Sequence, residues 1–489
     1  MTGRRALRKV SLTFRLWTDP QSVTAQREES LAARIGGSAP IAFAILIAAS
    51  LVIGLLFMEP KRPLYDAIRY LSYAINIYDH GVFGLDGVGS TAAPAPGSTH
   101  APLYPTWLAG LMFADSGLRD TLLCYVQNQS PDIPCPGDYT PIIAAQLILA
   151  GVLFGSVWLM ARTLSGSAPI AWIAAVAAML ARNPFQYANQ LLTEALLIPL
   201  LAVVLMFLTL ALCEKRPRWM IAAGIALGLA ALTRPAYAYL FMAMALVLAV
   251  AGLVRVRRPV IFACLFFAVS YGAIIAPWLI RNEALHGRMA LTTGYAGDIL
   301  SQRVAYNRMT WREFGIAFPY WFPDFGDKLA RMVGTREDYE RLRWKGEGSF
   351  YKDVAPAVYA DALREAGTPD RVVAHLVKTE ILGDPIKHAL VSLPLAWRAT
   401  LISKYWGMAG FLCFVAVITL RGRQGDFRLL LLSLPIWFMV AFHALVSVSI
   451  PRYNLALIPI YAYSMAWVID TVGRSLFAMV RQKYRRADA

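Results

Sequence analysis

Long apolar stretches alternate with polar segments along most of this chain. The apolar stretches are mostly close to the roughly twenty residues that a helix needs to cross a bilayer. The pattern therefore predicts an all-α polytopic membrane protein with about ten transmembrane helices. The expected spans are 39–58, 141–161, 168–180, 191–213, two short spans within 220–254, 260–280, 406–420, 429–449 and 455–477.

The polar segments divide the chain into four predicted parts. They are a cytoplasmic leader at 1–38, a transmembrane module at 39–280, a periplasmic region at 281–405, and C-terminal helices with a cytoplasmic tail at 406–489. The leader is basic and is expected to lie on the membrane as an amphipathic helix, with no cleavable signal peptide. The module includes a first outer loop at 59–140, and two short helices are expected within 350–383.

The charge distribution gives the orientation. The net charge is +16 with 57% hydrophobic residues, and basic residues gather in the short segments 214–218, 255–258, 421–428 and 481–486. Because cytoplasmic loops carry an excess of Lys and Arg, both termini are expected in the cytoplasm and both long loops outside. The same excess explains the basic total without a nucleic-acid partner.

The first outer loop contains a segment with helical periodicity. One face of it carries the apolar positions Leu64, Ile68, Leu71, Ile75 and Tyr78, and the other carries Asp66, Arg69, Tyr70 and Tyr73. Such a helix lies flat in the membrane interface with its polar face outward, so Asp66 is expected at the lip of the bilayer. The alternative is a surface helix in which Asp66 only neutralises Arg69.

Isolated arginines stand in the turns that should face outward. They are Arg182, Arg234, Arg281 and Arg452. The positive-inside rule disfavours them there, and a guanidinium group suits phosphate because it offers several donors and a permanent charge. These four, together with Arg69, are the predicted donor phosphate site. The alternative is that each caps a helix or extends to lipid headgroups.

A second acidic candidate is Glu194, at the point where an outward turn becomes a span. A helix N-terminus favours Glu through its dipole alone, which is the structural alternative. Four further side chains are predicted to line the substrate pocket: Tyr70, His100, Tyr104 and Tyr453. The pair His80 and His100 lacks a metal-ligand spacing, so no metal site or cofactor is predicted, although a divalent metal is left open.

Two of the five cysteines flank a polar segment of the first outer loop. They are Cys124 and Cys135, and in an oxidising compartment a disulfide between them is expected. The other three lie in or beside apolar runs and are expected to pack as inert hydrophobic side chains.

The predicted spans carry almost no ionisable residues at mid-membrane depth. Ion-coupled transporters usually place charged groups there. Because this chain places its charges at the outer rim, chemistry at the membrane surface is favoured over passage through the membrane.

A series of short motifs occurs in a characteristic order. They are D-x-x-R-Y at 66–70, HGVFG at 80–84, APLYP at 101–105, TEALL at 193–197, GLAALTRP at 228–235, APWLIRN at 276–282 and PRYNLALIP at 451–459. Through the order of these motifs, the chain resembles the integral-membrane glycosyltransferases of the GT-C type, which use sugars carried on polyprenyl phosphate. That family includes protein O-mannosyltransferases, aminoarabinose transferases and rhizobial lipopolysaccharide galacturonosyltransferases. It usually has an acidic pair in the first outer loop, whereas here Ala67 follows Asp66.

The resemblance implies an inverting sugar transferase of the bacterial inner membrane, active on its periplasmic face. Its partners would be a polyprenyl-phosphate-linked donor, membrane lipids, and a glycolipid, glycan or protein acceptor such as lipopolysaccharide. Asp66 is then expected to be the catalytic base, with Glu194 as the second candidate, and 281–405 a lid. A flippase or transporter of lipid-linked sugars is the alternative function, and a non-catalytic scaffold is a third.

Overall fold

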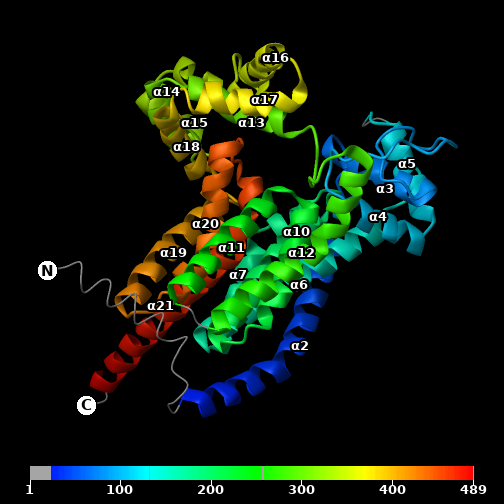
Figure 1. The fold of residues 1–489 in the computed structure, drawn as a ribbon. Coiled ribbons are helices and arrows are strands. Elements are labelled where there is room, and N and C mark those ends of the chain that lie inside the picture. The colour runs from blue at the N-terminus through cyan, green and yellow to red at the C-terminus, as the bar shows by residue number, and fades with distance from the viewer. Residues whose placement is uncertain (1–23, 131–132, 256–257, 488–489) are drawn as a thin grey trace. The chain divides into compact units, whose positions relative to one another are not determined.

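The computed structural model describes residues 24–130, 133–255 and 258–487, and within them every regular element is helical. Figure 1 shows the arrangement of these helices. The helices up to residue 286 are α2 (Thr24–Phe57), α3 (Asp66–His80), α4 (Leu103–Ala114), α5 (Gly117–Gln127), α6 (Thr140–Ser165), α7 (Ala168–Leu180), α8 (Asn183–Ala188), α9 (Glu194–Glu214), α10 (Trp219–Thr233), α11 (Ala236–Arg255) and α12 (Arg258–His286). The later ones are α13 (Ala296–Val304), α14 (Trp311–Tyr320), α15 (Gly326–Val333), α16 (Ala355–Ala366), α17 (Pro369–Leu376), α18 (Pro385–Thr400), α19 (Tyr405–Arg423), α20 (Arg428–Val446) and α21 (Ile458–Ala487).

The predicted all-α polytopic fold is confirmed. In the described part of the chain, 7 helices are long and apolar enough to cross a membrane: Gly37–Phe57, Thr140–Ser165, Glu194–Glu214, Val260–His286, Tyr405–Arg423, Arg428–Val446 and Pro451–Gln482. The count of ten is not confirmed, because Ala168–Leu180 and Trp219–Thr233 are shorter than a span, and Ala236–Val247 is only the part of the 20-residue helix α11 that counts among the shorter apolar helices. At 1.5 Å per residue, helices of 13 and 15 residues cover only part of a hydrocarbon core about 30 Å thick. The predicted leader helix before residue 24 lies outside the described residues.

The structure forms two compact units. The first unit comprises the residues up to Leu291, Leu412–Ser433 and the segment from Ile458. The second unit comprises Thr292–Phe411 and Leu434–Leu457. Residues 434–457, assigned from the sequence to the C-terminal helices, share the second unit with most of the predicted lid.

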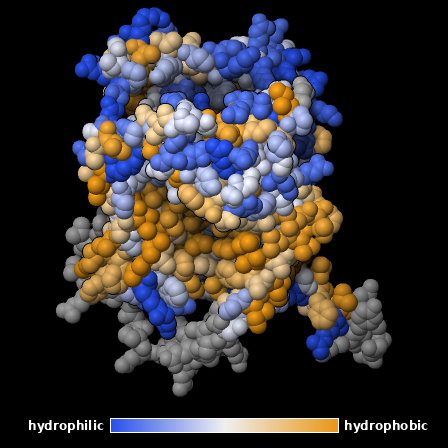
Figure 2. Space-filling view, turned by 90° about the vertical axis from the view of Figure 1, so that its right-hand side faces the viewer, coloured by the Kyte–Doolittle hydropathy of each residue, from blue (hydrophilic) through white to orange (hydrophobic). Residues whose placement is uncertain are grey.

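Small residues allow the helices of the first unit to approach closely. On α6, a Cβ added at Gly151 would lie 2.5 Å from the Cα of Ile47 on α2. On α10, a Cβ at Gly224 would lie 2.5 Å from the carbonyl oxygen of Phe267 on α12. Membrane helices lack a hydrophobic driving force between them, and such close packing supplies dispersion contacts in its place. On the face drawn in Figure 2, hydrophobic residues gather over a broad area, as expected for side chains that face lipid.

The amphipathic segment of the first outer loop is the helix α3, as its periodicity predicted. It packs against α4 and α5 rather than lying alone on a membrane surface. Leu71 and Ile75 of the apolar stripe are fully buried, whereas Leu64, before the helix begins, is 39% exposed. Tyr73, on the face expected to be polar and outward, is also buried. The helix is therefore part of a small helical cluster, and its position is held by protein contacts on both faces.

In the second unit, the two short helices expected within 350–383 are present. They are α16 and α17, each preceded or followed by a π-helical turn, at Phe350–Val354 and Val377–Ile381. Both pack on α13 through the buried side chains of Leu300, Val304, Val358, Ala362, Val372 and Leu376. A second buried cluster joins α14 and α18 to residues Ala444 and Val448.

Candidate active site

The carboxylate of Asp66 stands at the first position of α3, where an acidic side chain is favoured by the helix dipole. Asp66 is half-buried. The residue before it, Tyr65, has a φ of 52° and is 87% exposed. Left-handed φ at a bulky residue is strained and persists only where surrounding contacts enforce it. The chain thus enters α3 through a forced turn directly beside the candidate base.

The second predicted carboxylate, Glu194, begins α9 and forms an ion pair with Arg234, which follows α10. Arg234 Nη2 donates to Glu194 Oε1 at 3.0 Å. The Glu194 side chain is 1% exposed and the Arg234 side chain is 20% exposed. A buried carboxylate needs such a partner, because an unpaired buried charge is strongly unfavourable. Glu194 is therefore paired with Arg234, whose side chain is partly exposed.

Tyr70 connects this ion pair to Asp66. Its hydroxyl group lies near Thr193, the residue before Glu194. Burial raises the pKa of Tyr70 well above its ordinary value, and the nearby carboxylates of Glu194 and Asp66 raise it further. The hydroxyl group therefore stays protonated. The structure thus brings Asp66, Tyr70, Glu194 and Arg234 into one neighbourhood, although they come from α3, α9 and the end of α10.

His100 lies against the same face of α3. Its ring packs edge-on against Tyr70, with centroids 5.9 Å apart, and is tilted against Tyr73 at 5.5 Å. Burial lowers the pKa of His100, and the charge of Arg69 lowers it further, while Asp66 acts in the opposite direction. The imidazole is therefore neutral at neutral pH, with its Nδ1 3.1 Å from the Thr99 hydroxyl oxygen.

Tyr104, which was predicted to line the substrate pocket, lies in the protein interior. It is completely buried, and its hydroxyl donates to Gln146 Oε1 at 2.8 Å. Its ring meets the ring of Tyr70 edge-on at 5.5 Å. Gln146 also donates to the carbonyl oxygen of Ala188 at 2.7 Å. Tyr104 consequently packs on Tyr70 inside the protein, and its hydroxyl group is held by α6.

Arg281 is held beneath the first outer loop. Its Nη1 donates to the carbonyl oxygen of Gly97 at 2.8 Å, and its guanidinium lies 4.4 Å from the centroid of the Trp278 ring. Gly97 in turn rests against Tyr73, where an added Cβ would lie 3.3 Å from the ring. Arg281 therefore fixes the loop that covers Tyr73, one turn along α3 from Arg69 and Tyr70.

The remaining predicted arginines are placed differently. Arg69 is exposed on α3, one turn after Asp66. Arg182 is exposed in the turn before α8 with a φ of 62°. Arg452 and Tyr453 lie in a 3₁₀ segment, Pro451–Leu457, of the second unit. The first unit by itself therefore supplies Arg234, Arg281 and Arg69 to the surroundings of α3.

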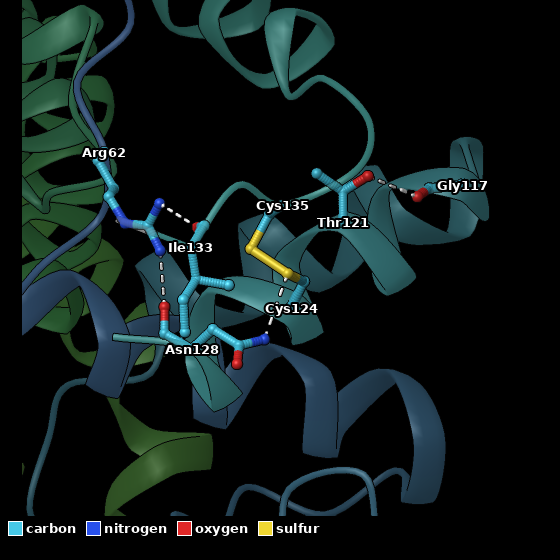
Figure 3. The surroundings of a disulfide bond; sticks show 7 residues. All are labelled: Arg62, Gly117, Thr121, Cys124, Asn128, Ile133 and Cys135. Atoms are coloured by element: carbon cyan, nitrogen blue, oxygen red, sulfur yellow. Dashed lines mark hydrogen bonds between the residues drawn. A yellow bond between two sulfur atoms is a disulfide. The ribbon is translucent and has the colours of Figure 1, made fainter. Parts of the chain in front are cut away.

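The segment that leads into α3 is anchored on a disulfide-closed loop (Figure 3). Cys124 and Cys135, the pair predicted to be oxidised, are joined with an S–S distance of 2.09 Å. Arg62 donates from Nη1 to the carbonyl oxygen of Ile133 at 2.9 Å and from Nη2 to that of Asn128 at 2.7 Å. These contacts hold the chain four residues before Asp66.

Three side chains of this neighbourhood were not among the sequence-based candidates. Tyr73 and Thr193 contact His100 and Tyr70, and Gln146 anchors Tyr104. Gln146 had a usable signal, because a polar amide inside an apolar run needs partners. Among the described residues, no group of three or more His, Cys, Asp or Glu side chains is placed to hold a metal ion.

Comparison with known proteins identifies the type of fold. Residues 137–280 match the family model described as dolichyl-phosphate-mannose-protein mannosyltransferase. This match confirms the resemblance to the GT-C type glycosyltransferases. It includes α6 to α10, and so Glu194 and Arg234, whereas Asp66 lies before it.

Among solved structures, the chain is similar to ArnT from Cupriavidus metallidurans. The structure bound to undecaprenyl phosphate aligns with 15% identity and a TM-score of 0.32, and the apo structure with 16% and 0.30. Each alignment covers 88% of this chain and 77% of the other. No curated protein matches the chain.

Proposed function

We propose that this protein transfers a sugar from a polyprenyl-phosphate carrier to a hydroxyl group at the periplasmic face of a bacterial inner membrane. The observation that carries the proposal is the neighbourhood of Asp66, Tyr70, Glu194 and Arg234 in the first unit. The family match supports a polyprenyl-phosphate donor, because dolichyl phosphate belongs to that class of lipid. The acceptor is a glycolipid, glycan or protein hydroxyl, and lipopolysaccharide is the acceptor we favour.

In the proposed reaction, Asp66 accepts the proton of the acceptor hydroxyl as its oxygen attacks the anomeric carbon. The bond from that carbon to the carrier phosphate breaks, and the anomeric centre is inverted. The phosphate leaves with the electron pair and needs cations rather than a general acid. Arg234 is suited to this role, because its side chain is partly exposed and its guanidinium is held by Glu194.

The two carboxylates have different proposed roles because their surroundings differ. Asp66 is half-buried at a helix end, so it can exchange a proton with a substrate. Glu194 is buried and bound to Arg234, so taking a proton would break its ion pair. We assign the base to Asp66 and the orientation of Arg234 to Glu194. The hydroxyl of Tyr70 and the neutral ring of His100 are placed to bind sugar hydroxyls.

Replacing Asp66 with Asn tests the proposed function. Asn keeps the size and polarity of the side chain but cannot act as a base, and loss of a general base typically lowers kcat by about 10²–10⁴-fold. Asp79→Asn on the same helix is the matched control, because the Asp79 carboxylate is held in an ion pair with Arg119 at 2.8 Å. The assay uses purified protein, a polyprenyl-phosphate-linked sugar and extracted glycolipid.

The control should lose some thermal stability and keep its turnover per folded molecule. Near-normal turnover in a well-folded Asp66→Asn variant would remove Asp66 as the base. Movement of the lipid-linked sugar across vesicles by the wild-type protein, without any transfer, would favour the flippase alternative.

A further inference from the structure

The helix α18 of the second unit exposes a face that is entirely apolar. Ile386 is 72% exposed, Leu390 37% and Leu393 53%, and Leu382, shortly before the helix, is 66% exposed. The spacing of four and three residues places the side chains of the helix on one stripe. The other exposed residues of α18 are Pro385 and Ala389, so every exposed side chain of the helix is apolar, and the exposed Asp384 precedes it. We name Leu382, Ile386, Leu390 and Leu393 the α18 stripe.

A helix of the same unit shows what a water-facing surface looks like here. The exposed face of α16 carries the charged side chains of Asp361, Arg364 and Glu365. Arg364 and Asp361 form an ion pair at 2.7 Å in which both side chains are more than half exposed. The two helices therefore differ in the chemistry of their free faces, although both belong to the predicted lid.

The buried face of α18 lies across one end of α20. His388, near the start of α18, has its Nε2 3.0 Å from the carbonyl oxygen of Leu445. Arg398, near the end of α18, donates to the carbonyl oxygen of Val448. Val391 lies between them and shares a buried cluster with that end of α20. Both ends of α18 thus contact residues 445–448, beside the last turn of α20 (Figure 1).

That end of α20 marks a membrane surface. α20 has 19 residues and is apolar enough to span, and at 1.5 Å per residue its length is about that of the hydrocarbon core. The span α19 begins at Tyr405, shortly after α18 ends, and only the turn 424–427 separates α19 from α20. The start of α19 and the end of α20 therefore emerge at the same surface, and α18, which packs on the end of α20, precedes α19 in the chain.

We propose that α18 is a membrane-interface helix, with the α18 stripe buried against the acyl chains of the bilayer leaflet at which α19 begins. An exposed apolar stripe is unfavourable in water, and an interfacial helix of this kind binds by burying its apolar face at the headgroup boundary. The tilt of the second unit is then limited by lipid. The sequence pattern assigned this segment to the periplasmic region 281–405. The proposal does not depend on the proposed reaction.

Site-specific quenching in lipid nanodiscs tests this assignment. Cys213, Cys264 and Cys413 are first replaced by Ala, and a single cysteine is introduced as Leu390→Cys and labelled with an environment-sensitive fluorophore. Leu393→Cys repeats the test one turn along, in case the first variant folds poorly. Arg364→Cys on α16 is the matched control. Quenching is measured with iodide in water and with lipids that carry a nitroxide near the headgroup.

The label at 390 should be quenched by the nitroxide lipid. Its quenching by iodide should be about threefold weaker than that of the control label, or weaker still. Iodide quenching equal to that of the control would overturn the proposal. Protection from both quenchers, together with cross-linking between two copies through the cysteine at 390, would also overturn it, in favour of a second copy of the chain as the occupant.

Discussion

At the scale of single residues, the surroundings of a carboxylate decide what it can do. Asp66 and Glu194 both stand at the first position of a helix and have the same local helix-dipole environment. They differ in tertiary contacts, because Arg234 reaches Glu194 and leaves it 1% exposed. An ionised carboxylate that is buried and paired resists protonation, whereas a half-buried one at a helix end can act as a base.

We expect Glu194→Gln to raise the KM for the lipid-linked donor more than it lowers kcat. Gln keeps the size of the side chain but removes the charge that orients Arg234, and the loss of a charged hydrogen bond should cost about 1–3 kcal/mol of stability. Kinetics and thermal denaturation of the purified variant measure both effects. Glu214→Gln, at the other end of the same helix, is the control and should change neither constant. A kcat loss as large as that of Asp66→Asn, with KM unchanged, would instead make Glu194 the base.

A histidine next to a buried arginine makes the stability of the second unit depend on pH. Arg303 is completely buried, and its neutral acceptors include the carbonyl oxygens of Ala444 and His388. Burial, and then the charge of Arg303, lowers the pKa of His388 to about 4. In the unfolded chain His388 therefore becomes protonated near pH 6.5, whereas in the folded protein it becomes protonated only near pH 4. The stabilising contribution is complete above pH 6.5 and is lost as the pH falls toward 4.

We expect the free energy of unfolding to fall by about 2 kcal/mol between pH 7 and pH 4.5 through this histidine, in addition to any other titration. His388→Gln keeps a hydrogen-bonding side chain and should remove that part of the pH dependence. Thermal denaturation of both proteins across this range measures the difference. His375→Gln, on α17, is the control for replacing a histidine elsewhere in the same unit. Identical pH dependence in wild type and His388→Gln would contradict this origin.

At the scale of elements, α3 is positioned by contacts at its entry. The backbone N–H of Lys61 donates to the carbonyl oxygen of Asn189 at 3.0 Å. The Tyr139 hydroxyl donates to the carbonyl oxygen of Lys61 at 2.9 Å. The Arg62 guanidinium donates to two carbonyl oxygens near the disulfide. These contacts enforce the strained backbone at Tyr65. The orientation of Asp66 thus depends on segments far from it in the chain.

Removal of the disulfide should therefore affect both stability and turnover. Closing a loop of this length contributes about 3 kcal/mol in the chain-entropy model, and Cys124→Ser with Cys135→Ser should lower the denaturation midpoint accordingly. Arg62→Gln should lower kcat, and its effect should not add to that of the cysteine replacement, because both act through the same loop. Arg119→Gln, which breaks the α5–α3 ion pair, is the control and should be additive. Free thiols at both positions in non-reduced protein would contradict the oxidised state.

At the scale of the whole molecule, the topology depends on three apolar helices that are not among the 7 candidate spans. If α7, α10 and α11 cross the membrane together with these 7 helices, the termini lie on one side, as the distribution of basic residues predicts. If none of them crosses, an odd number of spans places the termini on opposite sides. Alkaline phosphatase fused to either terminus should be inactive in cells, while fusions within 292–300 should be active. Activity of a C-terminal fusion would contradict the predicted orientation.

The sequence by itself determined the features that depend on neighbours along the chain. Apolar runs predicted the spans, a step of three and four residues predicted α3, and the short separation of Cys124 and Cys135 indicated their pairing. Helix formation and the closure of a short loop are local, so composition and periodicity are sufficient to predict them.

The tertiary structure alone decided which side chains meet. Glu194 pairs with Arg234 across 40 positions, Arg281 reaches Gly97 across 184, and Tyr104 is buried by α6 although its motif resembled part of a pocket. The predicted set of outward arginines is divided, with Arg452 in the second unit. Such contacts depend on how helices pack, and a pattern along one helix cannot specify the partner that another helix brings to it.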